Sequence, residues 1–187
     1  MLTLKTAPAQ AAVSDPEVLA HLRLEATAFD LEPDLRGKIE AAVADVENAT
    51  GRQLVTAVWQ LVLRSFPPGD CLLFPRPPLQ SVVSVTYRDA ALATQTFAAT
   101  NYVVQAPAGD RALPGRIVLQ PESSWPDIGN AIDAVTIEWK AGYGDNPANV
   151  PGFLRAMVLL RLGELYDRRL DEPTVDLARI LSGWRVL

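Results

Sequence analysis

The sequence predicts an α+β protein, in which a small helical bundle carries an antiparallel β module inserted between its second and third helices. Two observations support this prediction. Apolar residues recur at helical spacing near both ends of the chain, whereas the middle alternates apolar and polar residues with the period of strands. Helices and strands that are segregated along a chain are typical of the α+β class. The expected parts are an N-terminal helical part at 1–53, a β module at 54–140 and a C-terminal helical part at 141–187.

The first helix is predicted to begin at a capping box. Residues 1–13 are weakly patterned and are interpreted as an extended arm. Ser14 can cap the helix and Glu17 can complete the box, while Pro16 fits the first turn. Apolar residues at helical spacing continue from there, and the helix is expected to end near Phe29.

The second helix is predicted from Pro33 to a left-handed C-cap at Gly51. Its core face is expected to consist of Leu35, Ile39, Val43 and Val46. A second stripe, of small residues, faces away from the first and contains Ala41, Ala44 and Asn48. Two interpretations of this stripe stay open: an exposed surface chosen for its helix propensity, or a subunit interface where a neighbouring copy packs closely.

The β module is predicted to contain six or seven short strands, separated by turns rich in proline and glycine. The expected strands lie at 55–64, 72–74, 82–87, around Phe97, and at 102–105, 116–120 and 135–139. The proline-rich segment 74–79 is interpreted as a rigid crossover between two strands, and the alternative is a ligand for an SH3-like domain.

The helix at 153–169 is predicted to organise the helical part. Its apolar residues cover most of its circumference, which predicts burial on several sides. Glu164 lies one turn from both Arg161 and Arg168 and can pair with either. A short helix is expected near 174–181.

The composition excludes several classes of protein. Of 187 residues, 49% are hydrophobic and 21% are charged, which suits a globular core and not a disordered chain. The net charge of −5 argues against a protein that grips nucleic acid through its phosphates. The single cysteine, Cys71, excludes an internal disulfide and favours a reduced compartment. The chain has neither a signal-peptide pattern nor an apolar run of the ~18 residues that a membrane span needs, so a soluble, intracellular product is expected.

The chain offers little that could carry catalysis. His21 is the only histidine, and with a single cysteine this excludes a credible zinc site. We interpret His21 as a surface or helix-pairing residue. Acidic pairs are present without a sign that any pair faces a cleft, and no phosphate-binding glycine pattern occurs. We therefore expect no catalytic, cofactor-binding or metal-binding residues, and an enzyme that uses carboxylates alone is the weakest hypothesis.

The C-terminal Trp184 and Arg185 belong to the residue types that are most enriched at interaction hot spots. Two interpretations stay open: the segment folds back onto the core of its own chain, or it docks on a partner.

Taken together, the order and spacing of these segments resemble the head–tail connector (adaptor) proteins of long-tailed bacteriophages, in the branch that also occurs in bacterial gene transfer agents. The resemblance spans nearly the whole chain, and no single motif is diagnostic. It rests on the segments 13–23, 39–54, 58–59, 73–89 and 140–151, the helix after Pro151, and the ending Leu181-Ser182-Gly183-Trp184-Arg185. That ending departs from the more compact Pro-aromatic-Arg ending that the family leads us to expect.

The resemblance implies a structural protein without a cofactor, made in the bacterial cytoplasm and located at the head–tail junction of a virion or gene transfer agent particle. Copies would form a ring, twelvefold by the resemblance, between the portal protein and a stopper or tail-terminator protein. Double-stranded DNA would pass through this ring, and no membrane would be involved. The residues implied in portal docking are Ile180, Leu181, Trp184 and Arg185.

Two further expectations accompany this reading. The acidic residues Glu40, Asp45 and Glu47 are candidates for lining the bore, because an acidic wall would not hold the DNA. The alternative function is a non-catalytic carbohydrate- or peptide-binding module carried by the β insert. The aromatic residues that could line its groove are Trp59, Tyr87, Tyr102, Trp125 and Trp139.

Overall fold

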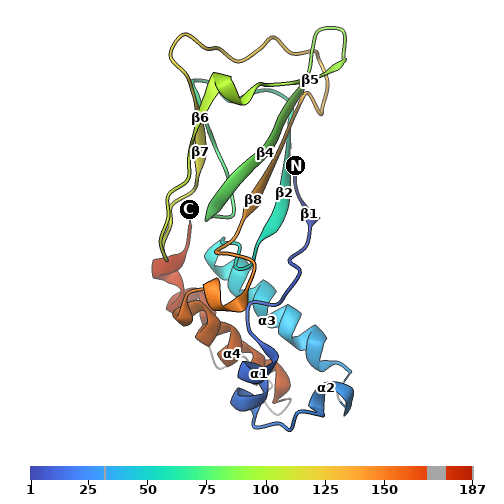
Figure 1. The fold of residues 1–187 in the computed structure, drawn as a ribbon, viewed down its shortest axis with the longest axis vertical. Coiled ribbons are helices and arrows are strands. Elements are labelled where there is room, and N and C mark those ends of the chain that lie inside the picture. Colours follow the sequence, from blue (N-terminus) through green and yellow to red (C-terminus); the bar gives the residue numbers. More distant parts are fainter. Residues whose placement is uncertain (32, 168–175, 187) are drawn as a thin grey trace. The chain divides into compact units, whose positions relative to one another are not determined.

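The computed structural model describes residues 1–31, 33–167 and 176–186 and contains two compact units (Figure 1). The β unit comprises Met1–Ala7 and Thr56–Gly142, and the helical unit comprises Pro8–Val55 and Tyr143–Leu187. The presence of helices together with antiparallel sheets confirms the predicted α+β class. None of the helices in the described ranges is long and apolar enough to cross a membrane.

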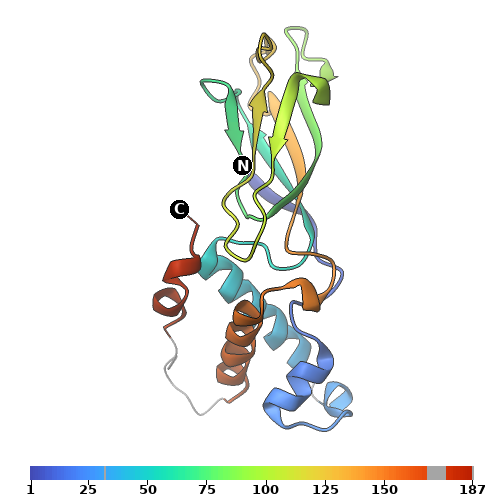
Figure 2. The same cartoon turned by 60° about the vertical axis from the view of Figure 1, so that its left-hand side comes forward.

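The β unit contains a five-stranded and a three-stranded antiparallel sheet (Figure 2). The larger sheet has the order β1 (Leu2–Thr6), β2 (Ala57–Leu63), β8 (Val135–Ala141), β4 (Leu79–Arg88) and β5 (Thr94–Thr96). The smaller has the order β3 (Cys71–Leu73), β7 (Arg116–Leu119) and β6 (Tyr102–Gln105), and a short 3-10 turn, η1 (Ala99–Asn101), precedes β6.

Seven of these strands lie close to their predicted positions, and β1 was missed. In β1 the residue Leu2 lies opposite Leu61 and Leu4 lies opposite Trp59. The N-terminal arm is therefore in part a strand. Sequence reasoning overlooked it because the apolar–polar alternation is short, with only Leu2 and Leu4 as apolar residues of the strand.

The core of the β unit lies between its two sheets and is built around Trp139, which is fully buried. The ring of Phe74 packs against it with a centroid distance of 5.3 Å. The other buried members of this core are Leu72, Leu79, Val85, Phe97, Tyr102, Ile117, Val135, Ile137 and Ala141.

The helical unit contains α1 (Asp15–Leu22), α2 (Ala28–Leu31), α3 (Leu35–Thr50), α4 (Gly152–Tyr166) and α5 (Leu177–Ile180). Two 3-10 turns accompany them, η2 (Pro147–Asn149) and η3 (Ser182–Trp184). Its core is mainly aliphatic and draws on α1, α3, α4 and the C-terminal segment, with fully buried members that include Val18, Leu35, Val46, Leu154 and Leu181.

The predicted start of α1 is confirmed and its predicted end is wrong. The Glu17 carboxylate accepts hydrogen bonds from the Ser14 amide (2.9 Å) and hydroxyl (2.8 Å). The helix stops at Leu22, well before residue 29, because Arg23 takes a left-handed conformation with φ 57°. A left-handed residue ends a helix, and glycine or asparagine is usual at that position, so an arginine there does not predict a helix end.

Gly51 caps α3 with φ 69°, as predicted. In α4 only Leu154, Val158 and Leu162 are fully buried, and the side chain of Phe153 is 41% exposed. The expectation that α4 is buried on several sides is therefore too strong: one apolar stripe faces the core and its flanks are half-buried. The helix ends at Tyr166, and the predicted continuation at 168–169, with Arg168, lies outside the described residues.

Candidate functional site

The C-terminal segment, residues 176–186, folds back onto its own helical unit. Leu181 is fully buried and Trp184 is 8% exposed. The amide of Val186 donates a hydrogen bond of 2.9 Å to the carbonyl of Thr50, the last residue of α3. The backbone of this segment thus satisfies a carbonyl that the end of a helix leaves open.

A buried arginine holds the same segment in place. Arg52 is 3% exposed, and its Nε donates a hydrogen bond of 2.8 Å to the carbonyl oxygen of Trp184. Its Nη1 lies 3.4 Å from the hydroxyl of Tyr143. Sequence reasoning did not single out Arg52. The available signal was a charged residue directly after the Gly51 cap, at the point where the chain turns into the core.

The four residues implied in portal docking divide into two pairs. The side chains of Leu181 and Trp184 belong to the core of the helical unit, whereas Ile180 is 44% exposed and Arg185 is also exposed. The indole of Trp184 stacks on the ring of Phe153, with centroids 5.4 Å apart and planes 13° apart. The buried pair therefore anchors the segment and the exposed pair remains available to a partner.

The three small residues proposed as a subunit interface, Ala41, Ala44 and Asn48, are all exposed on α3. The buried residues of the same helix, which include Ile39, Ala42 and Val46, occupy other positions around it.

Two of the three acidic residues proposed for the bore make contacts within the helical unit. The Asp45 carboxylate accepts a hydrogen bond of 2.8 Å from Arg161, which also donates one of 2.9 Å to Glu164. These hydrogen bonds, that of Asp45 first, raise the pKa of Arg161 above its ordinary value. Glu47 accepts hydrogen bonds from the Gln53 side chain and the Leu54 amide. Glu40 is exposed.

A further ion pair joins α1 to α4. The Nη1 atom of Arg155 lies 2.6 Å from Glu17, the residue that also closes the capping box of α1. The hydrogen bond from the Ser14 amide is the main cause that lowers the pKa of Glu17, and Arg155 adds to it. One carboxylate therefore both caps α1 and fixes it to α4.

The aromatic residues proposed for a carbohydrate or peptide groove pack with the core of the β unit instead. Trp139 is fully buried and Tyr102 is 8% exposed. Trp125 stacks on Phe66 with centroids 4.5 Å apart and donates its indole N–H to the Gly69 carbonyl. Trp59 and Tyr87 are partly buried against the same core. The alternative function thus loses the groove on which it depended.

His21 is exposed on α1 and lies opposite Gly163 of α4, where its Nε2 would be 3.4 Å from an added Cβ. This position agrees with the helix-pairing interpretation. Within the described residues, no three histidine, cysteine, aspartate or glutamate side chains are grouped so as to hold a metal ion.

Comparison with known proteins gives matches among solved structures. No protein-family model and no curated protein matches the sequence. The chain is similar over its full length to a chain in the neck of an empty gene transfer agent (GTA) particle computed with C6 symmetry, with 25% identity, a TM-score of 0.81 and coverage of 96% of that chain. The same values describe its likeness to a chain in the virion of a native GTA particle. A chain from the neck of a native GTA particle computed with C12 symmetry matches with 24% identity and a TM-score of 0.77, over 100% of this chain and 96% of that one, which shows a shared fold.

These likenesses confirm the resemblance to the head–tail connector family that the sequence indicated.

Proposed function

We propose that this chain is a structural subunit of the neck of a virion or gene transfer agent particle. In this proposal it is a head–tail connector (adaptor): copies form a ring at the head–tail junction, between the portal protein and a stopper or tail-terminator protein, and DNA passes through the ring. The helical unit is the body of the subunit, and the β strands between α3 and α4 are its insert.

The observation that supports this proposal most strongly is the full-length likeness to particle neck chains at a TM-score of 0.81. The matched chains are parts of a particle rather than enzymes, which agrees with the prediction that this protein is not an enzyme. One of the matched necks was computed with C6 and another with C12 symmetry. A closed ring of six or twelve subunits needs two different surfaces on each subunit that fit one another.

For the ring contact we propose the exposed face of α3 that carries Ala41, Ala44 and Asn48. Small side chains let a neighbouring element approach the helix backbone closely. Changing Ala41 and Ala44 together to glutamate would place bulk and like charges in such a contact. The control replaces Glu40, exposed on the same helix, by glutamine.

Electron microscopy of the purified protein, alone and with the portal protein of the same particle, tests the ring. We expect ring-shaped particles from the unchanged chain and from Glu40→Gln, and none from Ala41→Glu/Ala44→Glu. Rings that form equally well from the double variant would exclude this face of α3. A purified chain that never forms or joins a ring would contradict the proposed function itself.

For portal docking we propose the exposed side chains of Ile180 and Arg185, presented by the anchored C-terminal segment. The anchoring by Leu181, Trp184 and Arg52 keeps the cost of ordering the segment low when it binds. The variant Ile180→Asp/Arg185→Glu changes only exposed side chains, and Val83→Asp, at a 50% exposed position in β4, is its control.

We expect the double variant to lose co-purification with the portal protein while the control keeps it. Normal attachment of the double variant would show that the portal contacts lie elsewhere on the chain.

For the bore we propose an acidic lining to which Glu40 contributes, since the carboxylates of Asp45 and Glu47 are held within the helical unit. A ring structure in which basic side chains line the hole would contradict this.

A further inference from the structure

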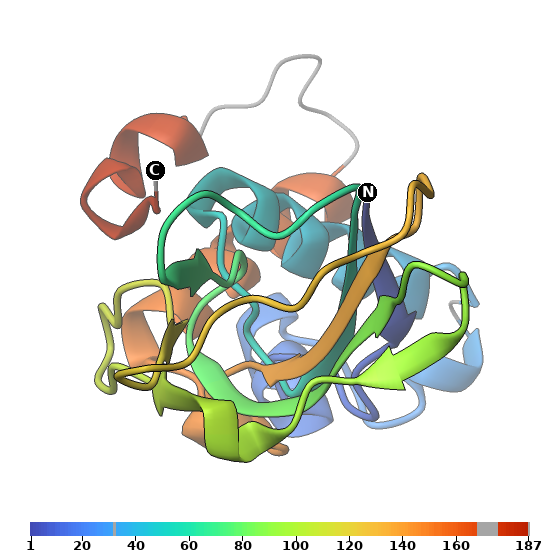
Figure 3. The same ribbon diagram turned by 90° about the horizontal axis from the view of Figure 1, so that it is seen from above.

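The strand β1 lies at the edge of the five-stranded sheet (Figure 1; Figure 3 gives the view from above), and within the described residues β2 is the strand that pairs with it. All five of its residues are exposed, and Leu2 and Leu4 are 39% and 43% exposed. An exposed edge strand with apolar side chains offers a place where another strand can pair.

The hydrogen bonds to β2 show which backbone groups of β1 are directed outward. Met1 and Val62 exchange both hydrogen bonds, at 2.6 Å and 2.8 Å. Because bonded and non-bonded pairs alternate in an antiparallel ladder, the next bonded pair is Thr3 with Gln60. The N–H and C=O groups of Leu2 and Leu4 therefore point away from β2, toward the free edge.

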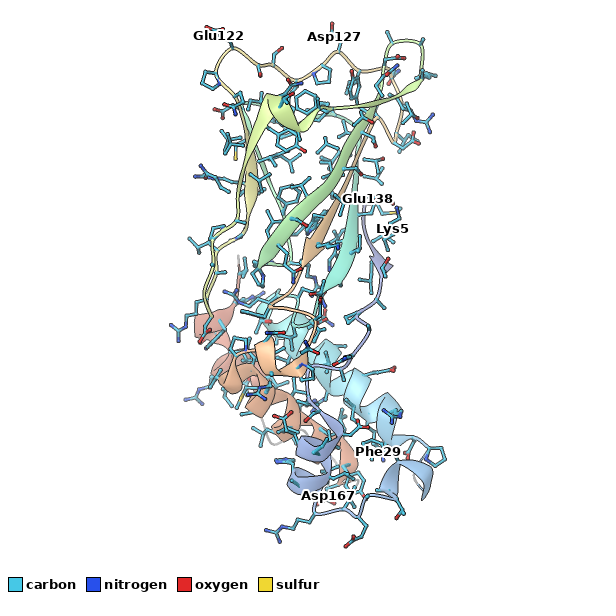
Figure 4. All side chains as sticks on the ribbon, viewed as in Figure 1. Lys5, Phe29, Glu122, Asp127, Glu138 and Asp167 are labelled. Carbon is cyan, nitrogen blue, oxygen red and sulfur yellow. The ribbon has the colours of Figure 1, made fainter. Side chains whose placement is uncertain are left out.

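The side chains of these two leucines lie on the face of the sheet that carries the core. Leu4 is opposite Trp59, which in turn is opposite the buried Trp139 of β8. On the other face, Lys5 forms an ion pair with Glu138 (Figure 4). A lysine on an edge strand can prevent pairing with another strand, but the charge of this lysine is neutralised by Glu138.

We propose that two copies of this chain pair through their β1 strands, antiparallel and related by a two-fold axis near Thr3. In this register Leu2 of one copy lies opposite the partner's Leu4, and Leu4 opposite the partner's Leu2. The outward N–H and C=O groups of Leu2 in each copy then exchange hydrogen bonds with those of Leu4 in the other copy. Four hydrogen bonds form in this way. The four leucine side chains then meet on one face, and the two Thr3 residues lie opposite one another as a non-bonded pair.

A second copy fits this edge because the edge is complementary to itself. The edge offers its free groups at two residues in alternation, and an identical antiparallel strand offers them at the same spacing. The paired sheets continue one another, and the two-fold axis puts residues 8 onward of the two copies at opposite ends of the new pair.

The pairing has a consequence for assembly, and this step rests on the proposed ring. A cyclic ring joins unlike surfaces of successive subunits and contains no such two-fold contact between neighbours. The β1 pair must therefore open before a ring closes. The β1 pair is therefore a form of the free protein, in which the unpaired edge of β1 is covered until the ring assembles.

A single cysteine at position 3 tests the pairing, in a Cys71→Ser background. Opposed residues of a non-bonded antiparallel pair have Cα atoms about 4.5 Å apart, within the range that a disulfide spans. We expect Thr3→Cys to form disulfide dimers on mild oxidation. The control Val83→Cys is also exposed but lies in an inner strand. It should form on the order of tenfold less dimer, since only chance collisions join it.

A second variant distinguishes cross-links that depend on backbone pairing from cross-links that form by chance collision. Leu4→Pro removes one outward N–H and no bond to β2, which proline tolerates at a sheet edge. Added to Thr3→Cys it should abolish the excess of dimer, whereas Leu4→Ala, which keeps the N–H, should retain part of it. Dimer yields equal to those of Val83→Cys, or yields that Leu4→Pro leaves unchanged, would overturn the proposal.

Electron microscopy of the Thr3→Cys protein before and after reduction then tests the role in assembly. We expect rings from the reduced protein only. Rings built from oxidised dimers would contradict the claim that the β1 pair must open before a ring closes. If rings form but Thr3→Cys gives no cross-link, the β1 pairing is wrong and the proposed neck function stands. If cross-links form but no rings appear in any condition, the β1 pairing stands and the proposed neck function is contradicted.

Discussion

The two units of this chain are held together in different ways. The β unit draws, apart from β1, on one continuous stretch, and its strands form ladders around an aromatic core that contains Trp139 and Phe74. The helical unit combines sections that are far apart in the sequence around an aliphatic core. Its sections are also joined by charged side chains. Backbone ladders thus organise one unit, and specific polar side chains join the parts of the other.

Three of these polar contacts connect distant elements of the helical unit. The Arg155 guanidinium connects α4 to Glu17 of α1, and Arg161 connects α4 to Asp45 of α3. Arg52 connects the segment after α3 to the carbonyl of Trp184. The three arginines differ in burial: Arg52 is almost fully buried, whereas the ion pairs of Arg155 and Arg161 are partly exposed to water. We therefore expect the cost of removing each one to follow its burial.

The largest effect is expected in the β core. Trp139→Ala should lower the free energy of unfolding by about 3–5 kcal/mol, because it removes a fully buried indole and leaves a cavity. Urea unfolding measures this loss. Val83→Ala, at an exposed position in β4, should change the free energy little, and a small effect at Trp139 would contradict the central place given to this side chain.

The next effect tests the single buried stripe of α4. Leu162→Ala should cost about 2–5 kcal/mol, since its side chain is fully buried. Leu159→Ala, at a half-buried position on the same helix, should cost clearly less. Thermal unfolding of the two variants compares them directly. Equal losses would restore the prediction that α4 is buried on several sides.

A smaller effect is expected from Arg52. Arg52→Met keeps much of the side-chain volume but removes the charged donor from the Trp184 carbonyl, at a cost of about 1.5–3 kcal/mol. The loss should appear as faster hydrogen exchange at Val186 and as easier proteolysis of the C-terminal segment. Arg179→Met, at an exposed position in that segment, should leave both unchanged. An unaltered C-terminal segment in Arg52→Met would show that the apolar anchors Leu181 and Trp184 suffice.

The sequence predicted the strands well because each has its own local signal. The segment 102–105, bounded by turns, is found as β6 with the same bounds, and the capping box at Ser14 and the glycine cap at Gly51 are found where expected. The errors lie where structure depends on contacts that are distant in sequence. β1 is a strand because β2 offers its edge, whereas the two leucines of Leu2–Thr6 are too short a pattern to predict it.

The candidate site was predictable in its types of residue and not in their environments. Trp184 and Arg185 were singled out as residue types that are enriched at interaction hot spots, with folding back and docking both left open. Only the structure shows the tryptophan anchored and the arginine exposed. The difference depends on Arg52, more than 130 residues upstream of Trp184. No local pattern could reveal that partnership. The early end of α1 at Arg23 has the same origin, because the left-handed turn lies at a residue that does not favour it.

The smallest effect concerns Glu17 and depends on pH. Its pKa in the folded protein is lowered below the ordinary value of about 4.5, chiefly by the Ser14 amide. A carboxylate with a lowered pKa contributes stability above its unfolded pKa, and this contribution is lost as the pH falls through the folded value. Thermal unfolding of Glu17→Gln should therefore show a lower midpoint than the unchanged chain at neutral pH. The two midpoints should converge as the pH falls below about 4.5.

The control for this measurement is Glu40→Gln, which changes an exposed carboxylate on α3. Its midpoint should follow that of the unchanged chain at every pH. If Glu17→Gln did the same, the charge of Glu17, and with it the pair with Arg155, would contribute no measurable stability, because glutamine can still complete the capping box. The contacts between distant helical sections would then rest on the buried Arg52 and on the aliphatic core, because partly exposed ion pairs contribute little.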